Sequence, residues 1–483
     1  MRTAAQFDLI VIGAGPAGLA AAGTAAAAGA NVLLVDEQAT PGGQIYRNMA
    51  QADDARLAIL GDDYAAGLRL LAAVEEPGVQ YQPNAMVWQV TAPLDEPTSD
   101  GPTRGESTRE VFYSVAGKAY RAAAAQVVLA TGALERPMPI PGWTLPGVMN
   151  AGAAQILLKS GLQPDGDVVL AGSGPLLFLL ATQLHRAGTT VRALLDTTPP
   201  SNWLQAAPHF LSALAAPDYL WKGRELYRDL ARTGIPHLRR VEALSVVERD
   251  GRAGGIECLH NGKPVTIAAD LTLIHQGVVP NVQLSRSLRL QHVWDDAGRA
   301  WIPETSADGQ SSLRGIAIAG DGAGINGAQA AAFHGELAAL KALQASGHDV
   351  AKSRIADIAR AHRRHTAPRK LIDRLYEPAP EFRTPPDDVI VCRCEEVTAG
   401  TLRQFARDGC QGPNQAKAFG RCGMGPCQGR YCGLTVSEVM ADAHGVQPSD
   451  IGYYRLRPPI KPVTLGEVAG LDDNEVTPSA RVV

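Results

Sequence analysis

The sequence predicts an α/β fold with two dinucleotide-binding domains, followed by a small helical domain that carries cysteines. Three observations predict it. A βαβ unit with a glycine turn occupies residues 8–36, the same pattern returns over residues 167–196, and six of the seven cysteines lie between residues 392 and 432. A chain of 483 residues is also too long for one hydrophobic core, which favours two or three domains.

The first unit, DLIVIGAGPAGLAAAGTAAAAGANVLLVD, has every part of a dinucleotide-binding fingerprint. Gly13 makes the tight turn, Gly15 lets the backbone approach a pyrophosphate, and Gly18 lets the helix lie close to its strand. The turn continues into Pro16 and Ala17. The helix N-terminus then directs free N–H groups and a partial positive charge at the diphosphate.

The acid that ends this unit is placed to bind a ribose. Asp36 closes the second strand, where a carboxylate accepts hydrogen bonds from ribose hydroxyls. Glu37 is the less favoured alternative for this role. In the following PGGQ segment, Gly42, Gly43 and Gln44 permit a close backbone approach to the same ligand, although an ordinary glycine turn is the alternative. The fingerprint alone does not distinguish FAD from NAD.

Two later segments decide between these ligands. One strand ends in ATG at Thr131 and Gly132 and resembles the second FAD contact of two-dinucleotide-domain flavoproteins, and another strand delivers Gly320 and Asp321. The Asp321 carboxylate is placed to accept hydrogen bonds from a flavin ribityl chain, while the helix that follows points its N-terminus at the flavin or pyrophosphate. Three spaced motifs therefore predict FAD as the ligand of the first unit.

The second unit departs from the fingerprint at one position. The spacing from Gly172 to Asp196 matches the first unit to within one residue, but Leu177 replaces the third glycine. A leucine there pushes the helix off its strand and shifts the N–H groups that would hold a pyrophosphate. We therefore predict a structural unit and hold NAD(P) binding as the weaker alternative. His275, on a later apolar run, is expected to be a satisfied core histidine rather than a redox group.

The cysteine-rich segment gives the most specific signal in the chain. Cys392 and Cys394 form CxC, 27 residues intervene, and Cys422 and Cys427 form Cx4C. Four thiolates in two close pairs suit a 2Fe-2S cluster or zinc. The single-residue gap favours the cluster, because structural zinc sites space their paired cysteines by two to four residues. Cys432 repeats the four-residue gap and is an alternative ligand.

Other residues near these thiols bear on the same choice. Gly423 and Gly425 let backbone N–H groups turn towards sulfur, and nearby positive charge favours an anionic cluster that accepts an electron. Cys410 is a further alternative ligand, whereas Cys258, alone on a strand, is expected to be an inert core thiol. The positive charge comes from three basic residues: Lys417, Arg421 and Arg430.

Composition excludes several classes of function. The net charge of −4 leaves no footprint for nucleic acid. The longest apolar run, near residues 168–182, is too short for a transmembrane segment, which needs about 20 residues. The N-terminus lacks a signal-peptide core, so cytoplasmic residence is expected, and peripheral association with the inner face of a membrane is compatible with it. Crowded cysteines in a cytosolic chain indicate metal chemistry rather than disulfides.

An ordered set of motifs now resembles a known family, the α (A) subunits of bacterial multi-subunit FAD-dependent opine, D-hydroxyproline and amino-acid dehydrogenases. The α chain of opine oxidase and the flavin/iron-sulfur subunit of hydrogen cyanide synthase belong to it, and the α chain of sarcosine oxidase is more distant. The motifs are VIGAGPAGLAAA, PGGQ, IPGWTLPGVMNAGAAQ, VVLAGSGPLL, HQGVVPN, AGDGAGINGA, VCRCEEVT and RCGMGPCQGRYC.

This resemblance implies a Rossmann pair like that of thioredoxin and glutathione reductases, with a BFD-like 2Fe-2S domain. It implies that a β subunit related to FAD-dependent amino-acid oxidases oxidises the amine, and that this chain relays the electrons to a quinone or another acceptor. Some members carry FMN at a subunit interface, and a small ferredoxin-like γ subunit is a further expected partner. Two alternatives stay open: a self-contained NAD(P)H-dependent flavin/iron-sulfur reductase, and a zinc-binding scaffold.

Domain boundaries follow from these motifs. The polar insertion LDEPTSDGPTRGES is expected to be an exposed loop. Residues 455–470 are expected to run extended over the protein or onto a partner. The predicted parts are a discontinuous FAD domain (1–150 and 270–340), a second Rossmann domain (151–269), a helical linker (341–385), a cluster domain (386–445) and an extended tail (446–483).

Overall fold

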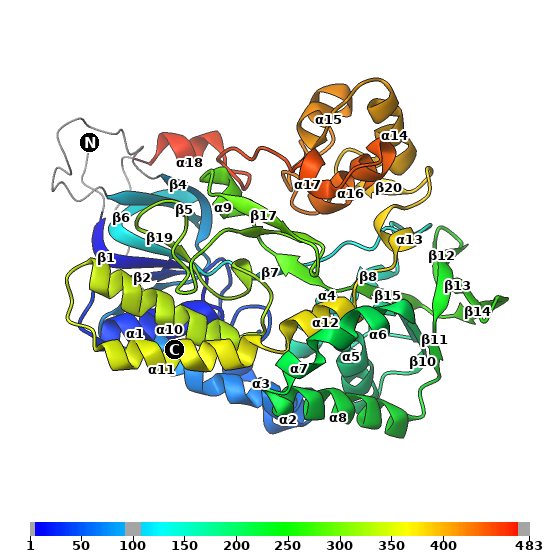
Figure 1. The fold of residues 1–483 in the computed structure, drawn as a ribbon, viewed down its shortest axis with the longest axis horizontal. Helices are drawn as coiled ribbons and strands as arrows, with labels where there is room; N and C mark the ends of the chain where they lie inside the picture. The colour runs from blue at the N-terminus through cyan, green and yellow to red at the C-terminus, as the bar shows by residue number, and fades with distance from the viewer. Residues whose placement is uncertain (1–4, 92–107, 472–483) are drawn as a thin grey trace.

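The computed structural model describes residues 5–91 and 108–471, so the predicted loop at 94–107 lies outside the described residues. Figure 1 shows three parts: a first domain built on the N-terminal strands, a second domain coloured mostly green, and a small helical domain that lies apart from both sheets. We call residues 389–456 of this third part the cysteine domain.

The first domain is built on a seven-stranded sheet in which β1 is central. β1 pairs in parallel with β2 on one side and β6 on the other, so Ile12 lies beside both Val35 and Leu129. The strand order is β3-β2-β1-β6-β5-β4, and β19 also pairs with β6. The strands are β1 (Ala5–Ile12), β2 (Val32–Val35), β3 (Val79–Gln82), β4 (Met86–Thr91), β5 (Arg109–Val115), β6 (Lys118–Leu129) and β19 (Ile316–Ile318).

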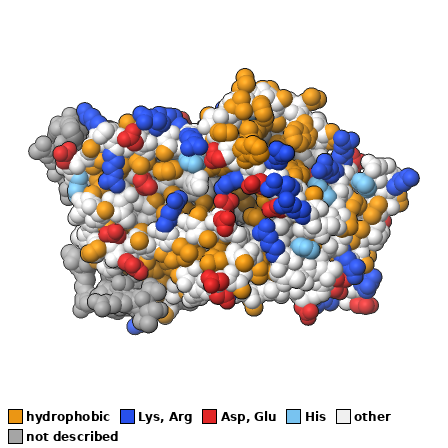
Figure 2. Space-filling model, turned by 90° about the horizontal axis from the view of Figure 1, so that it is seen from below, with side chains coloured by type: hydrophobic (Ala, Val, Ile, Leu, Met, Phe, Trp, Pro, Cys, Tyr) orange, Lys and Arg blue, Asp and Glu red, His pale blue; other side chains and the backbone are white. Residues whose placement is uncertain are grey.

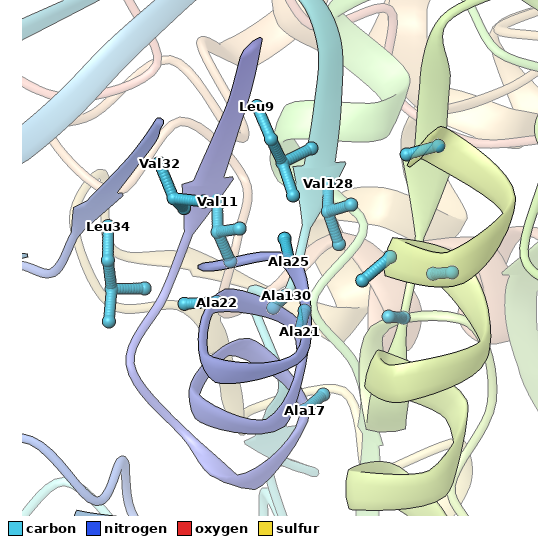
Figure 3. Packing of buried hydrophobic residues seen from close by; sticks show 14 of the residues in the cluster. Leu9, Val11, Ala17, Ala21, Ala22, Ala25, Val32, Leu34, Val128 and Ala130 are labelled. Carbon is cyan, nitrogen blue, oxygen red and sulfur yellow. The ribbon is translucent and has the colours of Figure 1, made fainter. Parts of the chain in front are cut away.

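Two helices with small side chains pack on one face of this sheet. Figure 3 shows alanines of α1 (Pro16–Ala27) facing Leu9, Val11 and Val128 of the sheet, with a second helix beside them. That helix is α10 (Ala328–Ala345), and a side chain in place of its Gly335 would collide with the backbone of α1. Small residues therefore bring both helices close to the sheet and to each other.

The second domain is a five-stranded parallel sheet in the order β11-β10-β9-β15-β8. Its helices include α4 (Ala151–Lys159), α5 (Pro175–Arg186), α6 (Ser201–Ala206), α7 (Phe210–Ala213) and α8 (Pro217–Thr233). Its strands are β8 (Val148–Asn150), β9 (Val168–Ser173), β10 (Val191–Asp196), β11 (His237–Arg239) and β15 (Leu271–Gln276). A three-stranded antiparallel sheet lies at its edge: β12 (Val241–Arg249), β13 (Arg252–His260) and β14 (Lys263–Ala268).

One predicted boundary is wrong. The return to the first domain was expected at residue 270, but β15 is a buried strand of the second sheet that pairs with β9 and β8. A buried parallel strand needs hydrogen-bond partners on both edges, and only the second sheet offers them here. The chain returns one strand later, where β16 (Val278–Pro280) pairs with β7 (Ala133–Glu135).

The cysteine domain has its own core of thiols, aliphatic residues and Tyr454. Leu456 also belongs to this core, so the domain continues past the predicted end at residue 445. Its elements are β20 (Ile390–Cys392), β21 (Val397–Thr398), α14 (Ala399–Arg407), α15 (Pro413–Gly420), α16 (Gly433–His444) and α17 (Pro448–Ile451).

The C-terminal tail is only partly extended. It crosses from the cysteine domain to the first domain, where the Ile460 amide donates to the Trp88 carbonyl at 2.9 Å. It then forms a short helix, α18 (Leu465–Ala469), where extended chain was predicted. A capping box between Thr464 and Glu467 satisfies the first free N–H groups, which explains why a helix starts there.

The segment between α10 and the cysteine domain is helical and packs on both Rossmann domains. It contains α11 (Lys352–Thr366), α12 (Arg369–Leu375) and α13 (Pro380–Arg383). Asn202 of α6 fixes the end of α12 by donating to the carbonyls of Leu375 and Glu377.

Basic and acidic side chains are mixed over the face of the molecule seen in Figure 2. Among the described helices, none is long and apolar enough to cross a membrane.

Candidate functional site

A cavity of about 1230 Å³ opens where the three domains meet. Its wall includes the glycine turn of the first unit, the corresponding turn of the second unit, and residues of the cysteine domain. Four of the thiols predicted as ligands or alternatives line it: Cys392, Cys394, Cys427 and Cys432. The tertiary structure thus connects motifs that are about 380 residues apart in the sequence.

The glycine turn has the geometry that the fingerprint predicts. Gly13 has φ +107°, and a side chain there would meet the backbone of Ala130. A side chain at Gly18 would collide with the Gly13 carbonyl oxygen, so helix α1 lies directly on the turn. Pro16 is the first residue of that helix, and Ala17 lines the cavity beside it. The helix N-terminus therefore opens into the cavity, as anion binding requires.

Asp36 holds the turn in place. Its carboxylate accepts hydrogen bonds from the amides of Ala14, at 2.5 Å, and Gln38, at 2.7 Å. Burial raises the pKa of this carboxyl group, and the two amide bonds oppose that shift. Glu37 beside it is half exposed and pairs with Lys461 of the tail at 2.5 Å. Both acids line the cavity, so the ribose role predicted for Asp36 is open to either.

The PGGQ segment packs its backbone against the first turn. A Cβ at Gly43 would lie 2.8 Å from Gly15 Cα, so two glycines meet here; Gly42, at φ +124°, forms the preceding bend. The Gln44 carbonyl accepts a hydrogen bond at 3.1 Å from the amine of Lys159, which belongs to the second domain. This close approach was predicted as ligand contact, and it also joins the two domains.

Lys159 is a cavity residue that no sequence motif indicates. Its side chain lines the cavity and is buried without a carboxylate partner among the described residues; its other bond is to Gln155, at 3.0 Å. Burial, followed by repulsion from Arg47, lowers the pKa of this amine to about 7. Nothing in the local sequence distinguishes it from a surface lysine at the end of a helix.

The two later motifs lie on the same side of the cavity. Thr131 and Gly132 are fixed by Asn281, whose backbone amide donates to the Gly132 carbonyl at 2.9 Å. Gly320, at φ +68°, lies against Ala17 of the first unit. Asp321 accepts from the amides of Asn326 and Gly327 through one oxygen. Burial raises the pKa of Asp321, which also lines the cavity.

The second unit keeps the turn but fills the space behind it. A side chain at Gly172 would collide with the His275 carbonyl. Leu177 is 1% exposed and packs in the core of the domain. The next residue, Phe178, lies against Tyr376 from the linker, with ring centres 6.3 Å apart. A chain segment from outside the unit thus packs beside the fingerprint helix.

Glu135 and His275 form a buried pair at the junction of the two domains. His275 Nδ1 lies 2.5 Å from Glu135 Oε1, and both Glu135 oxygens accept from the Gly152 amide at the start of α4. His275 is therefore buried and satisfied, as expected, although it also lines the cavity. Asn150, next to α4, accepts a hydrogen bond from Tyr431 of the cysteine domain.

The thiols form two groups. The Sγ atoms of Cys392, Cys422 and Cys432 all lie within 4.8 Å of one another, in buried positions. Bonds from the other two thiols lower the pKa of Cys392, and backbone amides, including that of Gly423, act in the same direction. The second group is the interacting pair of Cys394 and Cys427, which lies nearer the surface.

The structure places every predicted ligand in one of these groups and adds one thiol. Cys432 joins Cys392 and Cys422, and its four-residue spacing was the only sequence signal for it. A side chain at Gly425 would meet Cys394 Cβ, so that glycine allows the two cysteine segments to approach. Cys410 is buried elsewhere in the domain and bonds to the Gly412 carbonyl, and Cys258 lies in a core of the second domain.

Comparison with known proteins identifies the family. Residues 7–335 match the model of the pyridine nucleotide-disulphide oxidoreductases. The chain belongs to this family. It is therefore a flavoprotein-type oxidoreductase, and membership implies FAD as the ligand of the first unit. Residues 389–471 match the sarcosine oxidase A3 domain, which covers the cysteine domain and the tail.

Individual relatives confirm the predicted resemblance. The A chain of opine oxidase from Rhizobium meliloti (strain 1021) is 41% identical over 96% of this chain and 99% of its own length. The HcnB chain of hydrogen cyanide synthase from Pseudomonas aeruginosa is 33% identical over 94% of this chain and 96% of its own. The solved structure of L-proline dehydrogenase from P. horikoshii shares the fold, with a TM-score of 0.67, 20% identity, and coverage of 97% of this chain and 81% of that one.

Proposed function

We propose that this chain is the electron-transferring subunit of a heteromeric FAD-dependent dehydrogenase of opines, D-hydroxyproline or related secondary amino acids. A partner subunit related to amino-acid oxidases would oxidise the CH–NH bond of the substrate, and this chain would pass the electrons to a quinone or another acceptor. One observation carries the proposal: a single cavity is lined by both the dinucleotide fingerprint and the cysteines.

The residues of the first unit fit FAD. The first turn of α1 carries backbone N–H groups that have no intrahelical acceptor and can hold a diphosphate, and Asp36 and Glu37 line the same cavity. Asp321 lines this cavity as well. Bound here, the flavin would supply the ability to take up two electrons and release them singly.

The thiols fit a 2Fe-2S cluster. Such a cluster needs four cysteine thiolates, two for each iron. Cys394 and Cys427 form one pair, and Cys392 with one of its two neighbours would form the other. The two candidates for the fourth ligand are Cys422 and Cys432. The Tyr454 hydroxyl favours Cys422, because it donates to Cys422 Sγ at 3.2 Å but lies 3.9 Å from Cys432 Sγ.

Substitution of single cysteines tests this ligand set. We expect Cys394→Ser and Cys427→Ser to lower the iron content from about two atoms per chain to nearly none, because each removes a thiolate that nothing replaces. Cys422→Ser should also lose its iron, whereas Cys432→Ser should retain iron and show a changed electron paramagnetic resonance spectrum. Iron analysis and electron paramagnetic resonance of the reduced protein measure this, with Cys410→Ser as the matched buried control. Retention of iron by Cys422→Ser and its loss from Cys432→Ser would exchange the two assignments.

Reconstitution tests the relay itself. The chain should be purified with and without the products of its neighbouring genes and assayed for dye reduction with opines, D-hydroxyproline and other amino acids. We expect activity only in the assembled complex, since the substrate pocket is assigned to a partner. FMN at the subunit interface and a ferredoxin-like γ subunit would be detected by flavin analysis and by composition of the purified complex. Amine dehydrogenation by the chain alone would contradict the relay.

A second candidate function is a self-contained NAD(P)H-dependent reductase. The observation that favours it is that Gly174 and Leu176 of the second fingerprint line the same cavity. Leu177 and the linker residue Tyr376 disfavour it, because they fill the space around the helix that would hold the nucleotide. Anaerobic addition of NADH or NADPH decides: prompt bleaching of the flavin would establish this function, and we expect none.

A further inference from the structure

Four basic side chains gather where the tail leaves the cysteine domain. They are Arg289, which follows the short helix α9 (Gln283–Ser287), Lys417 of α15, and Arg455 and Arg457 of the tail. Lys417 Nζ donates to the Arg455 carbonyl at 3.3 Å. Figure 1 shows the chain between α17 and α18 running past α9. Arg455 and Arg457 lie in this chain, and both act electrostatically on Arg289. We call these four residues the basic patch.

The charges of the basic patch repel one another. Burial, and then repulsion from Arg455 and Arg457, lowers the pKa of Arg289. The pKa of Lys417 is lowered by burial and by Arg457. In the part of the chain that the structure describes, none of the four pairs with a carboxylate. The mixed charges on the face in Figure 2 contrast with this uncompensated group.

The basic patch faces outward. Its three arginines are exposed, and none of its members lines the central cavity. Exposed side chains spread over a surface suit a macromolecule, whereas small-molecule sites are concave. A cluster of like charges that has no carboxylate partner among residues 5–91 and 108–471 is stabilised when an oppositely charged surface covers it.

One aromatic side chain separates the basic patch from the thiols. Lys417 Nζ lies 4.9 Å from the centre of the Tyr454 ring. On its other side, the Tyr454 hydroxyl contacts Cys422 and Cys432. Tyr454 is 1% exposed and fills the layer between them. A protein bound at the patch would therefore approach the thiol site more closely than one bound at a distant face.

We propose that the basic patch is the docking site of an acidic one-electron carrier protein, which takes electrons from the cysteine site across Tyr454. The electron transfer rests on the proposed function; the charge-selective docking does not. One electron leaves the reduced cysteine site for each carrier centre that is reduced. The patch thus assigns the acceptor side of the relay to this face of the cysteine domain.

Carriers of opposite charge test the proposal. The full chain is reduced anaerobically, excess reductant is removed, and haem reduction is followed by stopped flow with acidic cytochrome b5 and with basic cytochrome c. We expect the second-order rate for cytochrome b5 to fall steeply between about 20 and 300 mM salt, because screening lengths shrink to less than about 10 Å. Arg289→Gln/Arg455→Gln/Arg457→Gln should lower the low-salt rate about tenfold and flatten its salt dependence.

The matched control carries the same charge change elsewhere. Arg249→Gln/Arg252→Gln/Lys263→Gln alters three exposed residues on the β12–β14 sheet and should behave as the wild type. Flavin and iron contents establish that all variants are folded and loaded, and reduction by a neutral benzoquinone reports electron release without docking. Equal salt dependence for both cytochromes, or equal rates for the two triple variants, would overturn the proposal.

Two further outcomes would reassign the patch. Co-sedimentation with vesicles of phosphatidylserine and phosphatidylcholine that is lost in the arginine variant, with an unchanged cytochrome b5 rate, would make it a membrane-binding surface. Dissociation of the complex on size-exclusion chromatography, again with an unchanged rate, would make it an interface between subunits. Metal analysis separates these results from failure of the proposed function: zinc in place of iron would remove the relay but leave salt-dependent binding of cytochrome b5 intact.

Discussion

The two βαβ units of this chain share a turn but differ in what packs behind it. In the first unit, Gly18 lets α1 rest on the carbonyl of Gly13, and alanines fill the interface with the sheet. In the second unit, Leu177 occupies the equivalent position and α5 presents leucine and phenylalanine to its core. In the first unit small residues hold the helix against its turn, while in the second unit the equivalent position fills the core of the domain.

This difference separates what the fold requires from what nucleotide binding requires. Both units pair their two strands in parallel, because strand pairing depends on the apolar runs rather than on the third glycine. Ligand binding depends on where the first turn of the helix lies, which a single side chain can shift. Single substitutions in either unit test this division of roles.

The largest effect is expected from giving the first unit the residue of the second. In Gly18→Leu, the new side chain would collide with the Gly13 carbonyl, which is backbone and has no room to move. We expect complete loss of FAD and a decrease in the free energy of unfolding of about 3 kcal/mol or more. Flavin content after purification and chemical denaturation measure both. Ala27→Leu, at an exposed position of α1, is the control; FAD retention by Gly18→Leu would contradict the role of the glycine.

The reverse change should cost stability without creating a nucleotide site. Leu177→Ala leaves a cavity in the core of the second domain and should lower the free energy of unfolding by about 2–5 kcal/mol. NADH should still fail to bind, because Tyr376 packs beside the helix. Denaturation and isothermal titration with NADH provide the measurements, and Leu204→Ala, at an exposed position, provides the control. Tight NADH binding would show that Leu177 alone blocks the site.

A smaller, pH-dependent effect is expected where the two units meet at Lys159. The pKa of its amine is about 7 in the folded protein and 10.5 in a free side chain, so the unfolded chain binds one more proton between these values. Stability therefore falls as the pH drops through this window and stays constant below it. Lys159→Met should remove a slope of about 1 kcal/mol per pH unit between about pH 8 and 10.

Unfolding by urea at several pH values measures this slope, since only the difference between variant and wild type is needed. Lys263→Met, at an exposed lysine, should leave the slope unchanged. Parallel slopes for the wild type and Lys159→Met would show that the Lys159 amine remains charged in its buried position. That result would also remove Lys159 as a pH-sensitive contact between the domains.

The first unit could be predicted in detail because its constraints are local. Gly13, Gly18 and Asp36 act within one βαβ unit, so spacing alone places them. The strand β15 and the helix α18 were misplaced for two different reasons. The sequence placed β15 in the first domain because of the segment that follows it, whereas its strand partners lie in the second sheet. The helix α18 depends on a capping box that hydrophobic periodicity does not reveal.

By itself the sequence determined the two glycine turns, the family resemblance and the four paired cysteines, because each is a pattern of residues close together in the chain. Only the tertiary structure decided that Cys432 joins Cys392 and Cys422, and that Lys159 lies buried against the PGGQ loop. It alone formed the basic patch from three separate segments. Contacts of this kind depend on how domains pack, and no local pattern of residue types records that packing.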